Sequence, residues 1–335
     1  AVDERSSMKR LLPLALAALV LAACGSTSDS PEDATEGGPW SYVSGDGKTY
    51  KADSMPKRII AQGEAGAALM AFGIKPIAIY SNDPVKTNKS LKDLDLSGVE
   101  ILSETWGEID VEKAATLNPD LIVSSYWPLE KAYGGFEAGV KEESRKLADL
   151  ATVVGPAEGD SVVEKLEGYE KLAVSLGADV SDPKIADTKK TFEDAVDRFK
   201  TTVADQKGLT TLAVSPADDL LYVAVPGEAS ELSDFERWGL DIIDPDQPDP
   251  GFPYWENLSW ENADKYQPDV LLMDDRDAAN SLKTAEGQPT WDSIKAAKAK
   301  AYVAWPAYWI HTYKDYAEQL DLLSDAFEKA DPNLS

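Results

Sequence analysis

One phrase occurs twice in this chain, once in each half. The first copy, IDVEKAATLNPDLIV, covers residues 109–123, and the second copy, LSWENADKYQPDVLL, covers residues 258–272. Each copy begins with a residue suited to cap a helix, Asp110 or Ser259, and ends with Pro-Asp before an apolar run. This order predicts a short capped helix, a stop at the proline and a buried parallel strand. A repeat so widely spaced predicts two lobes of related build, with a cleft between them that can hold a ligand.

The length and the charge of the chain narrow its class. At 335 residues, the chain is longer than one hydrophobic core of about 250–300 residues supports, so two lobes are again expected. A formal net charge of −27 argues against nucleic acid as a partner, because phosphate backbones attract basic surfaces. The same charge argues against adsorption to an anionic membrane surface. We interpret it as the solubilising surface of an exported monomer.

The amino-terminal segment resembles the signal sequence of a bacterial lipoprotein. The basic pair Lys9-Arg10 precedes an apolar stretch over residues 11–20, which is shorter than the ~20 residues of a membrane-spanning helix. The stretch is followed by Leu-Ala-Ala and then Cys24, the one cysteine of the chain, and this order resembles a lipobox. The resemblance implies cleavage before Cys24, diacylation of its sulfur and anchoring to the extracytoplasmic face of the bacterial cell membrane. A secretory signal with an incidental cysteine is the alternative.

The chain divides into five predicted parts. These are a signal peptide over residues 1–23, a lipidated flexible tether over 24–50, an N-terminal lobe over 51–181, a linking helix over 182–206 and a C-terminal lobe over 207–335. Residues 1–7 precede Met8, and we interpret them as a mis-assigned start or an extraneous segment. The tether is rich in Ser, Gly, Asp and Glu, which favour a flexible chain.

Both lobes show strands that alternate with helices, and this order predicts right-handed crossovers and mainly parallel sheets. The linking helix begins with a capping Asp182 and a proline in its first turn. At ~1.5 Å per residue it is a stiff strut of about 36 Å. Strands are predicted at 57–61, 76–80, 121–123, 152–155, 209–214, 220–225 and 301–305, and helices at 65–72, 136–150 and 314–330, with a further helix ending at 238–239.

These features together resemble the iron-siderophore and vitamin B12 class of ABC-transporter substrate-binding proteins, class III, whose lobes are linked by a single helix. The resemblance covers residues 55–330 and rests on the lipobox, the strand PKRII over residues 56–60, the repeated phrase and the long helix. It implies an α/β fold of two Rossmann-like lobes joined by one long helix, with the ligand cleft between the lobes. It also implies a binding protein rather than an enzyme, with no cofactor, and delivery of a chelate to a membrane permease.

The resemblance gives two glutamates a role. In the family, one glutamate on each lobe docks onto arginines of the permease, and Glu112 and Glu261 occupy the matching positions of the two phrases. The residues themselves allow a second explanation, because a carboxylate in the first turn of a helix is stabilised by the helix dipole by about 0.3–1 kcal/mol. The recurrence of the glutamate in both copies favours docking.

Aromatic residues gather where predicted strands end or loops begin. In parallel α/β sheets the ligand lies beyond the carboxyl ends of the strands, and rigid rings suit a large, partly apolar ligand. Core or rim packing is the alternative for each ring taken alone, and Tyr308 lies in the same run as the last two rings. The aromatic residues predicted to bind the ligand are Tyr80, Trp106, Tyr126, Trp127, Tyr254, Trp255, Trp305 and Trp309.

Arg276 completes the predicted binding set, because a guanidinium can donate hydrogen bonds to iron-bound hydroxamate oxygens. A surface ion pair with Asp274 or Asp277 is the alternative. Few basic residues lie near the predicted cleft, so we expect a neutral or cationic ferric hydroxamate rather than a triply anionic catecholate. A corrinoid ligand, a sensory role for the same fold and a glycan-active enzyme with two carboxylates are further alternatives.

No resident metal site is expected. His311 is the single histidine of the chain, whereas a catalytic zinc site usually takes three protein ligands, often histidines. We interpret His311 as a structural or rim residue, and we expect iron only as part of a bound chelate.

Overall fold

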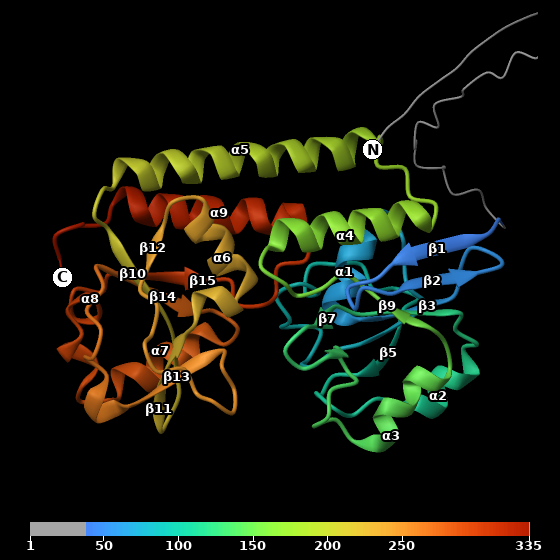
Figure 1. The fold of residues 1–335 in the computed structure, drawn as a ribbon, viewed down its shortest axis with the longest axis horizontal. Coiled ribbons are helices and arrows are strands. Elements are labelled where there is room, and N and C mark those ends of the chain that lie inside the picture. The colour runs from blue at the N-terminus through green and yellow to red at the C-terminus, as the bar shows by residue number, and fades with distance from the viewer. Residues whose placement is uncertain (1–37, 335) are drawn as a thin grey trace, which may run out of the picture. The chain divides into compact units, whose positions relative to one another are not determined.

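The structure is a computed structural model that describes residues 38–334 of the chain. The predicted signal peptide, Cys24 and the other residues up to 37 lie outside the described residues. Within them the polypeptide forms two lobes, each built on its own sheet, and a long helix runs along both lobes (Figure 1). None of the described helices is long and apolar enough to cross a membrane.

The N-terminal lobe is built on a five-stranded sheet in the order β5-β4-β3-β6-β9. All four strand pairs are parallel, which confirms the predicted sheet type. The strands are β3 (Ile59–Gln62), β4 (Ala78–Tyr80), β5 (Glu100–Ser103), β6 (Leu121–Val123) and β9 (Val153–Val154). The helices are α1 (Gly63–Ala71), α2 (Val111–Thr116), α3 (Glu142–Arg145), the 3₁₀ helix η1 (Lys146–Asp149) and α4 (Val162–Ser175).

Two parts of this lobe differ from the sequence prediction. The helix expected over residues 136–150 is only α3 and η1, because hydrogen bonds from Phe136 N–H to the Tyr133 carbonyl and from Val140 N–H to the Glu137 carbonyl close separate turns first. A small hairpin of β7 (Tyr126–Trp127) and β8 (Ala132–Tyr133), which was not predicted, follows β6. This hairpin carries residues of the cleft.

The tether prediction is wrong for residues 40–50. Strands β1 (Trp40–Val43) and β2 (Thr49–Ala52) form an antiparallel hairpin instead. Trp40 and Tyr42 alternate with exposed residues and are buried. The Trp40 indole donates a hydrogen bond to Ser175 Oγ at 2.9 Å, and the Tyr42 hydroxyl donates one to the Gly168 carbonyl at 3.1 Å. The hairpin therefore packs on α4 as part of the N-terminal lobe.

The C-terminal lobe has a mixed sheet in the order β13-β11-β10-β14-β15, with β12 beside β10. The pairs β10–β12, β10–β14 and β14–β15 are parallel, whereas β10–β11 and β11–β13 are antiparallel. The connection between β10 and β11 is too short for a parallel crossover. The strands are β10 (Thr210–Pro216), β11 (Leu220–Ala224), β12 (Asp241–Ile242), β13 (Trp255–Ser259), β14 (Val270–Asp274) and β15 (Tyr302–Trp305). The helices are η2 (Pro226–Glu228), α6 (Ser230–Arg237), η3 (Trp260–Asn262), α7 (Ala278–Glu286), η4 (Trp291–Ser293) and α8 (Lys295–Lys298).

The two copies of the repeated phrase fold differently at their starts. In the first copy, the Asp110 carboxylate accepts a hydrogen bond from the Lys113 N–H and caps α2, as predicted. In the second copy, Ser259 ends strand β13 and makes no side-chain cap, and η3 is a single 3₁₀ turn. Both copies end in a buried strand, β6 or β14, that pairs in parallel within its sheet. The shared part of the repeat is therefore this strand.

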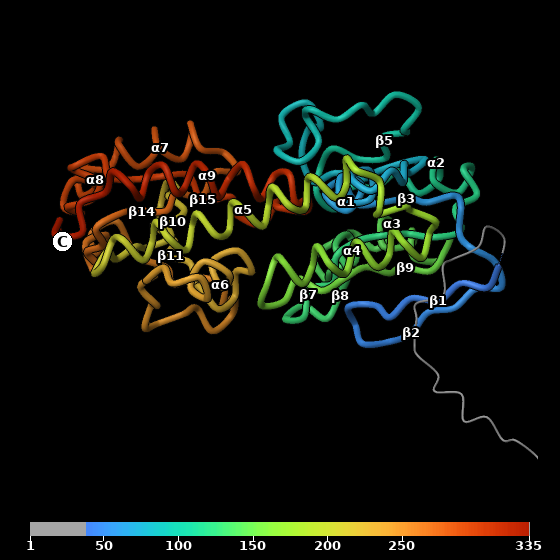
Figure 2. Tube along the Cα trace, turned by 90° about the horizontal axis from the view of Figure 1, so that it is seen from above, coloured from blue at the N-terminus to red at the C-terminus, as the bar shows by residue number. Residues whose placement is uncertain are grey.

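The lobes are linked by α5 (Pro183–Asp205), whose Asp182 cap and Pro183 confirm the predicted start. A second helix, α9 (Tyr313–Glu328), runs beside α5 in the same direction (Figure 2). Phe192 stacks on Tyr316 near one end, and the Gln206 side chain donates a hydrogen bond to the Phe327 carbonyl at the other. To reach the start of α9, residues 306–312 cross back from the end of β15 toward the N-terminal lobe, and we call this segment the return loop. One continuous apolar core includes side chains of both lobes, α5 and α9.

Candidate functional site

A cavity of about 880 Å³ lies between the lobes. Its lining comes from three parts of the structure, in this order: the N-terminal lobe, the C-terminal lobe and the return loop. The lining residues that the argument uses are Glu64, Asp83, Lys89, Trp106, Trp127, Glu130, Glu137 and Glu158 from the first, Phe252, Tyr254, Trp255, Arg276 and Asp277 from the second, and Tyr308, Trp309 and His311 from the third.

Aromatic rings meet across this cavity. Trp127, at the end of β7, lies with its ring centroid 6.4 Å from that of Tyr254 and 6.3 Å from that of Tyr308. The Trp255 and Tyr308 centroids are 6.2 Å apart, and Phe252 lies 4.7 Å from Tyr254. The C-terminal lobe and the return loop thus give the cavity a wall of ring faces and edges, which suits a bulky, partly apolar ligand.

Arg276 lies on this wall just after β14. Its guanidinium is 5.1 Å from the centre of the Tyr308 ring, and its Nη2 is 2.6 Å from Asp274 Oδ2. The side chain is half exposed. The structure therefore confirms the ion pair with Asp274 and also places Arg276 in the cavity lining, so the two interpretations of this residue are compatible.

Tyr308 is the most constrained residue of the wall. Its backbone has φ = 64°, a left-handed conformation that costs free energy for a residue other than glycine. Its hydroxyl oxygen is buried and has no hydrogen-bond partner among the described residues. Burial raises the pKa of this phenol well above its ordinary value, so Tyr308 remains a neutral donor.

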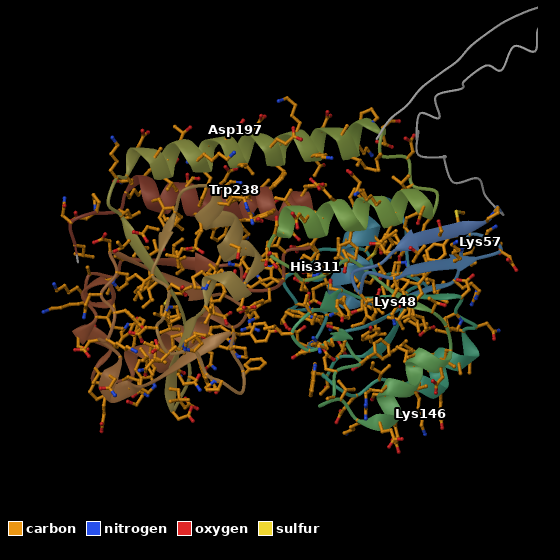
Figure 3. The ribbon with its side chains drawn as sticks, viewed as in Figure 1. Lys48, Lys57, Lys146, Asp197, Trp238 and His311 are labelled. Carbon is orange, nitrogen blue, oxygen red and sulfur yellow. The ribbon has the colours of Figure 1, made fainter. Side chains whose placement is uncertain are left out.

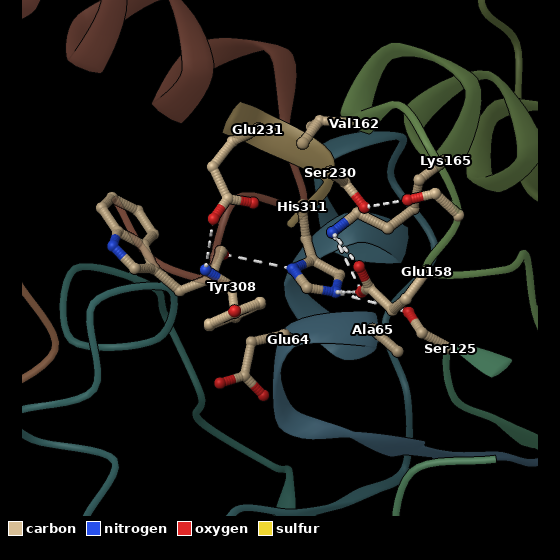
Figure 4. A network of polar contacts seen from close by, with 12 residues as sticks. Glu64, Ala65, Ser125, Glu158, Val162, Lys165, Ser230, Glu231, Tyr308 and His311 are labelled. Carbon is tan, nitrogen blue, oxygen red and sulfur yellow. Dashed lines mark hydrogen bonds and ion pairs between the residues drawn. The ribbon is translucent and has the colours of Figure 1, made fainter. Parts of the chain in front are cut away.

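Glu231, in the first turn of α6, holds Tyr308 in place. The buried Glu231 Oε1 accepts a hydrogen bond from the Trp305 indole at 2.7 Å. It also accepts one from the Tyr308 N–H at 3.3 Å (Figure 4). Burial raises the pKa of Glu231 to about 7. The site therefore contains a carboxyl group that changes charge near neutral pH, directly beneath the return loop.

Replacing Glu231 with Gln is expected to stabilise the protein increasingly as the pH rises. The folded-state pKa of about 7 exceeds the unfolded value of about 4.3, so the folded state binds an extra proton between these values. The stability that this extra proton contributes is complete below the unfolded-state pKa and is lost as the pH rises through the folded-state pKa. The neutral amide keeps the acceptor oxygen, so the variant gains roughly 3 kcal/mol over the wild type above about pH 8. Urea unfolding across this pH range measures the gain, and a difference that does not vary with pH would contradict it.

The wall formed by the N-terminal lobe is acidic. Glu64, at the start of α1, accepts hydrogen bonds from the side-chain amides of Gln62 and Asn88, and the Asn88 amide also donates to Asp83. Glu137 accepts a hydrogen bond from the Gly135 N–H at 2.8 Å. These donors are neutral.

Burial raises the pKa values of both Glu137 and Glu130, and repulsion from Glu137 adds to the shift at Glu130. The two carboxyl groups therefore lie close enough to sense each other.

A buried ionic cluster closes the base of the cavity. Glu158 Oε1 lies 3.0 Å from Lys165 Nζ and 3.2 Å from His311 Nε2, and all three side chains are at most 4% exposed. Burial opposes ionisation of Glu158, but Lys165 and His311 together lower its pKa to about 2. His311 Nδ1 lies 3.1 Å from the Trp309 carbonyl. His311, predicted to be a structural or rim residue, thus joins the return loop to the N-terminal lobe where the lobes meet (Figure 3).

Six of the nine residues predicted to bind ligand line the cavity: Trp106, Trp127, Tyr254, Trp255, Arg276 and Trp309. The other three do not. Tyr80 is 2% exposed and donates its hydroxyl hydrogen bond to the Gly134 carbonyl. Trp305 is fully buried against Glu231, and Tyr126 packs on Tyr133 in the β7–β8 hairpin. Tyr80 and Trp305 therefore lie behind the walls of the cavity, and Tyr126 belongs to the packing of the hairpin.

Both predicted docking glutamates are exposed. Glu112 lies in the first turn of α2 and Glu261 in η3. In Figure 1, α2 and the strand β13 that leads into η3 both lie on the side of their lobe remote from α5. Neither glutamate lines the cavity, so their role is separate from ligand contact.

Sequence reasoning missed the acidic wall and the role of the return loop. Glu64, Asp83, Glu130, Glu137 and Glu158 share no motif, and only the strong acidity of the whole chain hinted at them. No group of three or more metal-ligating side chains occurs within residues 38–334.

Comparisons with known proteins agree with this architecture. Residues 67–308 match the family model described as periplasmic binding protein. The solved structure of DesE, a ferric-siderophore receptor protein from Streptomyces coelicolor, is 29% identical, with a TM-score of 0.78 over 88% of this chain and 99% of that chain. FhuD2 from Staphylococcus aureus with bound ferrioxamine B is 19% identical, with a TM-score of 0.57 over 81% of this chain and 98% of that chain.

FeuA from Bacillus subtilis, a triscatecholate siderophore binding protein complexed with ferri-bacillibactin, is also 19% identical. Its TM-score is 0.60 over 84% of this chain and 95% of that chain. At this level of identity, FhuD2 and FeuA share the fold with this chain and nothing finer follows from them. Among curated proteins, none matches the chain.

Proposed function

The chain belongs to the periplasmic binding protein family, and we propose that it captures a ferric siderophore of the hydroxamate type and delivers it to an ABC permease. The observation that carries this proposal is the cavity of about 880 Å³, in which most aromatic rings come from the C-terminal lobe and the return loop and most carboxylates from the N-terminal lobe. A cavity of this size lies toward the upper end of the range for small-molecule sites. Binding rather than catalysis is the activity that such a cavity supports.

The balance of charge in the lining favours a hydroxamate over a catecholate. A ferric trihydroxamate core is neutral, whereas a ferric triscatecholate core carries three negative charges. The basic lining residues are Lys89, Arg276 and His311, and the last two are paired with Asp274 and Glu158. Carboxylates outnumber them, so a trianion would meet repulsion that a neutral or cationic complex avoids.

Delivery and location complete the proposal. We propose that Glu112 and Glu261 dock onto basic residues of the permease, since both are exposed and neither lines the cavity. We also propose that the chain is exported and anchored through a lipid on Cys24, which the order of residues before that cysteine supports. In this arrangement the protein acts as a monomer and carries iron only within the bound chelate.

Titration of tryptophan fluorescence tests the choice of ligand. Four tryptophans, Trp106, Trp127, Trp255 and Trp309, line the cavity, so an iron complex bound there quenches their emission. We expect ferrioxamine B or ferrichrome to quench with a Kd below about 1 μM. Ferric catecholates, ferric citrate and cobalamin are the comparison ligands. No response to any hydroxamate, or a response to cobalamin alone, would overturn the proposal.

A further inference from the structure

The two walls of the cavity differ in charge as well as in shape. The C-terminal lobe and the return loop supply most of the aromatic rings, Arg276 and one carboxylate, Asp277, whereas the N-terminal lobe supplies Trp106, Trp127 and the carboxylates of Glu64, Asp83, Glu130, Glu137 and Glu158. Of these five, Glu158 forms an ion pair with Lys165 and also contacts His311. The others face the cavity without an ion pair to any described residue.

Glu64 and Glu137 are the inner members of this acidic wall. Both side chains are half-buried, and their hydrogen-bond donors are amide groups of Gln62, Asn88 and Gly135. Both carboxylates raise the pKa of Tyr80, whose ring lies behind the wall and whose burial is the main cause of its shift. Both carboxyl groups therefore lie within electrostatic range of Tyr80.

Lys89, the basic residue of this wall, forms no ion pair with Glu64 or Glu137. Lys89, which the N-terminal lobe contributes to the lining, acts on Asp275 of the opposite lobe and lowers the pKa of that carboxyl, against a larger effect of burial. Partly desolvated carboxylates with neutral partners are costly to hold in the charged form, and a cation supplied by a ligand offsets that cost.

The opposite wall contains a hydroxyl group that no side chain or backbone group of the described residues satisfies. The buried Tyr308 hydroxyl lacks a partner among residues 38–334, although buried polar groups are rarely left unpaired. Tyr308 contacts the Arg276 guanidinium through its ring. A ligand that reaches both walls thus meets neutral or positive hydrogen-bond donors at one end and carboxylates at the other.

We propose that the cavity selects cationic chelates, with the iron-hydroxamate end of the ligand on the aromatic wall and a free ammonium group against Glu64 and Glu137. This inference rests on the proposed function, because it assigns the ligand class and its orientation within the same site. It predicts discrimination between siderophores that share one iron-binding core and differ only in the charge of the tail.

The test compares ferrioxamine B, whose tail ends in an ammonium group, with its N-acetylated form, which is neutral and keeps the same core. The wild-type protein is expected to bind ferrioxamine B about tenfold more tightly. The double variant Glu64→Gln/Glu137→Gln is expected to bind both complexes with equal affinity. Glutamine retains an acceptor oxygen for the Gly135 and Asn88 donors, so the walls keep their shape.

A matched control separates the local effect from the loss of net charge. The double variant Glu142→Gln/Glu143→Gln removes two exposed charges from the first turn of α3 in the same lobe, and it is expected to preserve the tenfold preference. Raising the salt concentration gives a second measurement on the unaltered protein, because it weakens binding of the cationic complex more than that of the neutral one.

The outcomes distinguish this inference from the proposed function. If neither ferric hydroxamate binds, the proposed function itself fails. If the wild type binds both complexes equally, or if Glu64→Gln/Glu137→Gln weakens both to the same extent, the ammonium subsite is overturned while hydroxamate binding stands.

Discussion

Reversing the charge of both proposed docking glutamates, Glu112→Lys and Glu261→Lys, is expected to reduce uptake of the ferric ligand to background while its affinity in solution stays unchanged. Both residues are exposed and neither lines the cavity, so the loss arises at the contact with the permease. Like charges placed across a docking interface repel and slow the productive encounter. Each single reversal is expected to give an intermediate rate, because one glutamate on the other lobe still docks.

The measurement is accumulation of iron-labelled ligand in cells whose only matching binding protein is the variant. Glu142→Lys/Glu143→Lys is the matched control, since it reverses two exposed charges on α3 and leaves the proposed docking pair intact. Fluorescence titration of each purified variant confirms that the cavity still binds. A Glu112→Lys/Glu261→Lys protein that transports at the wild-type rate would refute the docking role.

The parts of the fold that sequence patterns predicted are those determined by local chemistry. Asp182 and Pro183 began α5 at the predicted place, because a side-chain cap and a proline act within one turn. The run Leu121–Val123 became a buried strand, because three consecutive apolar residues need cover on both faces. The second phrase failed at its start, where Leu258 pairs with Leu221 in a sheet and this distant contact overrides the local helix signal.

The sequence predicted the approximate location of the candidate site but not which side chains line it. The rule that ligands lie beyond strand ends located Trp127 and Trp309 in the lining but also selected Tyr80 and Trp305. Sequence does not say which way a ring turns at the end of its strand. Trp305 points to Glu231, 74 positions away in the chain. The acidic wall combines carboxylates from separate segments of the N-terminal lobe, such as Glu64 and Asp83, which Asn88 joins, so no spacing pattern marked it.

Glu158 is the position where a single replacement is expected to cost the most stability. Its carboxylate lies 3.0 Å from Lys165 Nζ, with side-chain exposures of 4% and 1%. Glu158→Gln leaves the lysine charge buried without a counter-charge, and a broken buried pair costs about 3–5 kcal/mol. The same substitution replaces the carboxylate that His311 Nε2 meets at 3.2 Å with a neutral amide, so one attachment of the return loop to the N-terminal lobe is weakened.

The double variant Glu158→Gln/Lys165→Met distinguishes an unpaired charge from a loss of packing. Replacing both members of a buried pair with groups of similar volume is often neutral, so the double variant is expected to recover most of the stability lost in Glu158→Gln. Urea unfolding at neutral pH measures both, and a Glu158→Gln protein within about 1 kcal/mol of the wild type would refute a structural role for the pair.

The pH dependence of stability provides a second test of the role of Glu158. The pKa of Glu158 is about 2 in the folded protein and about 4.3 in an unfolded chain. As the pH falls, the unfolded state therefore binds a proton before the folded state does. The stability that Glu158 contributes is complete above its unfolded-state pKa and is lost as the pH falls to its folded-state pKa. Wild type and Glu158→Gln should thus converge in stability on acidification, whereas wild type and Glu231→Gln should diverge as the pH rises from about 4.3 to about 7 and differ by a constant amount above about pH 8.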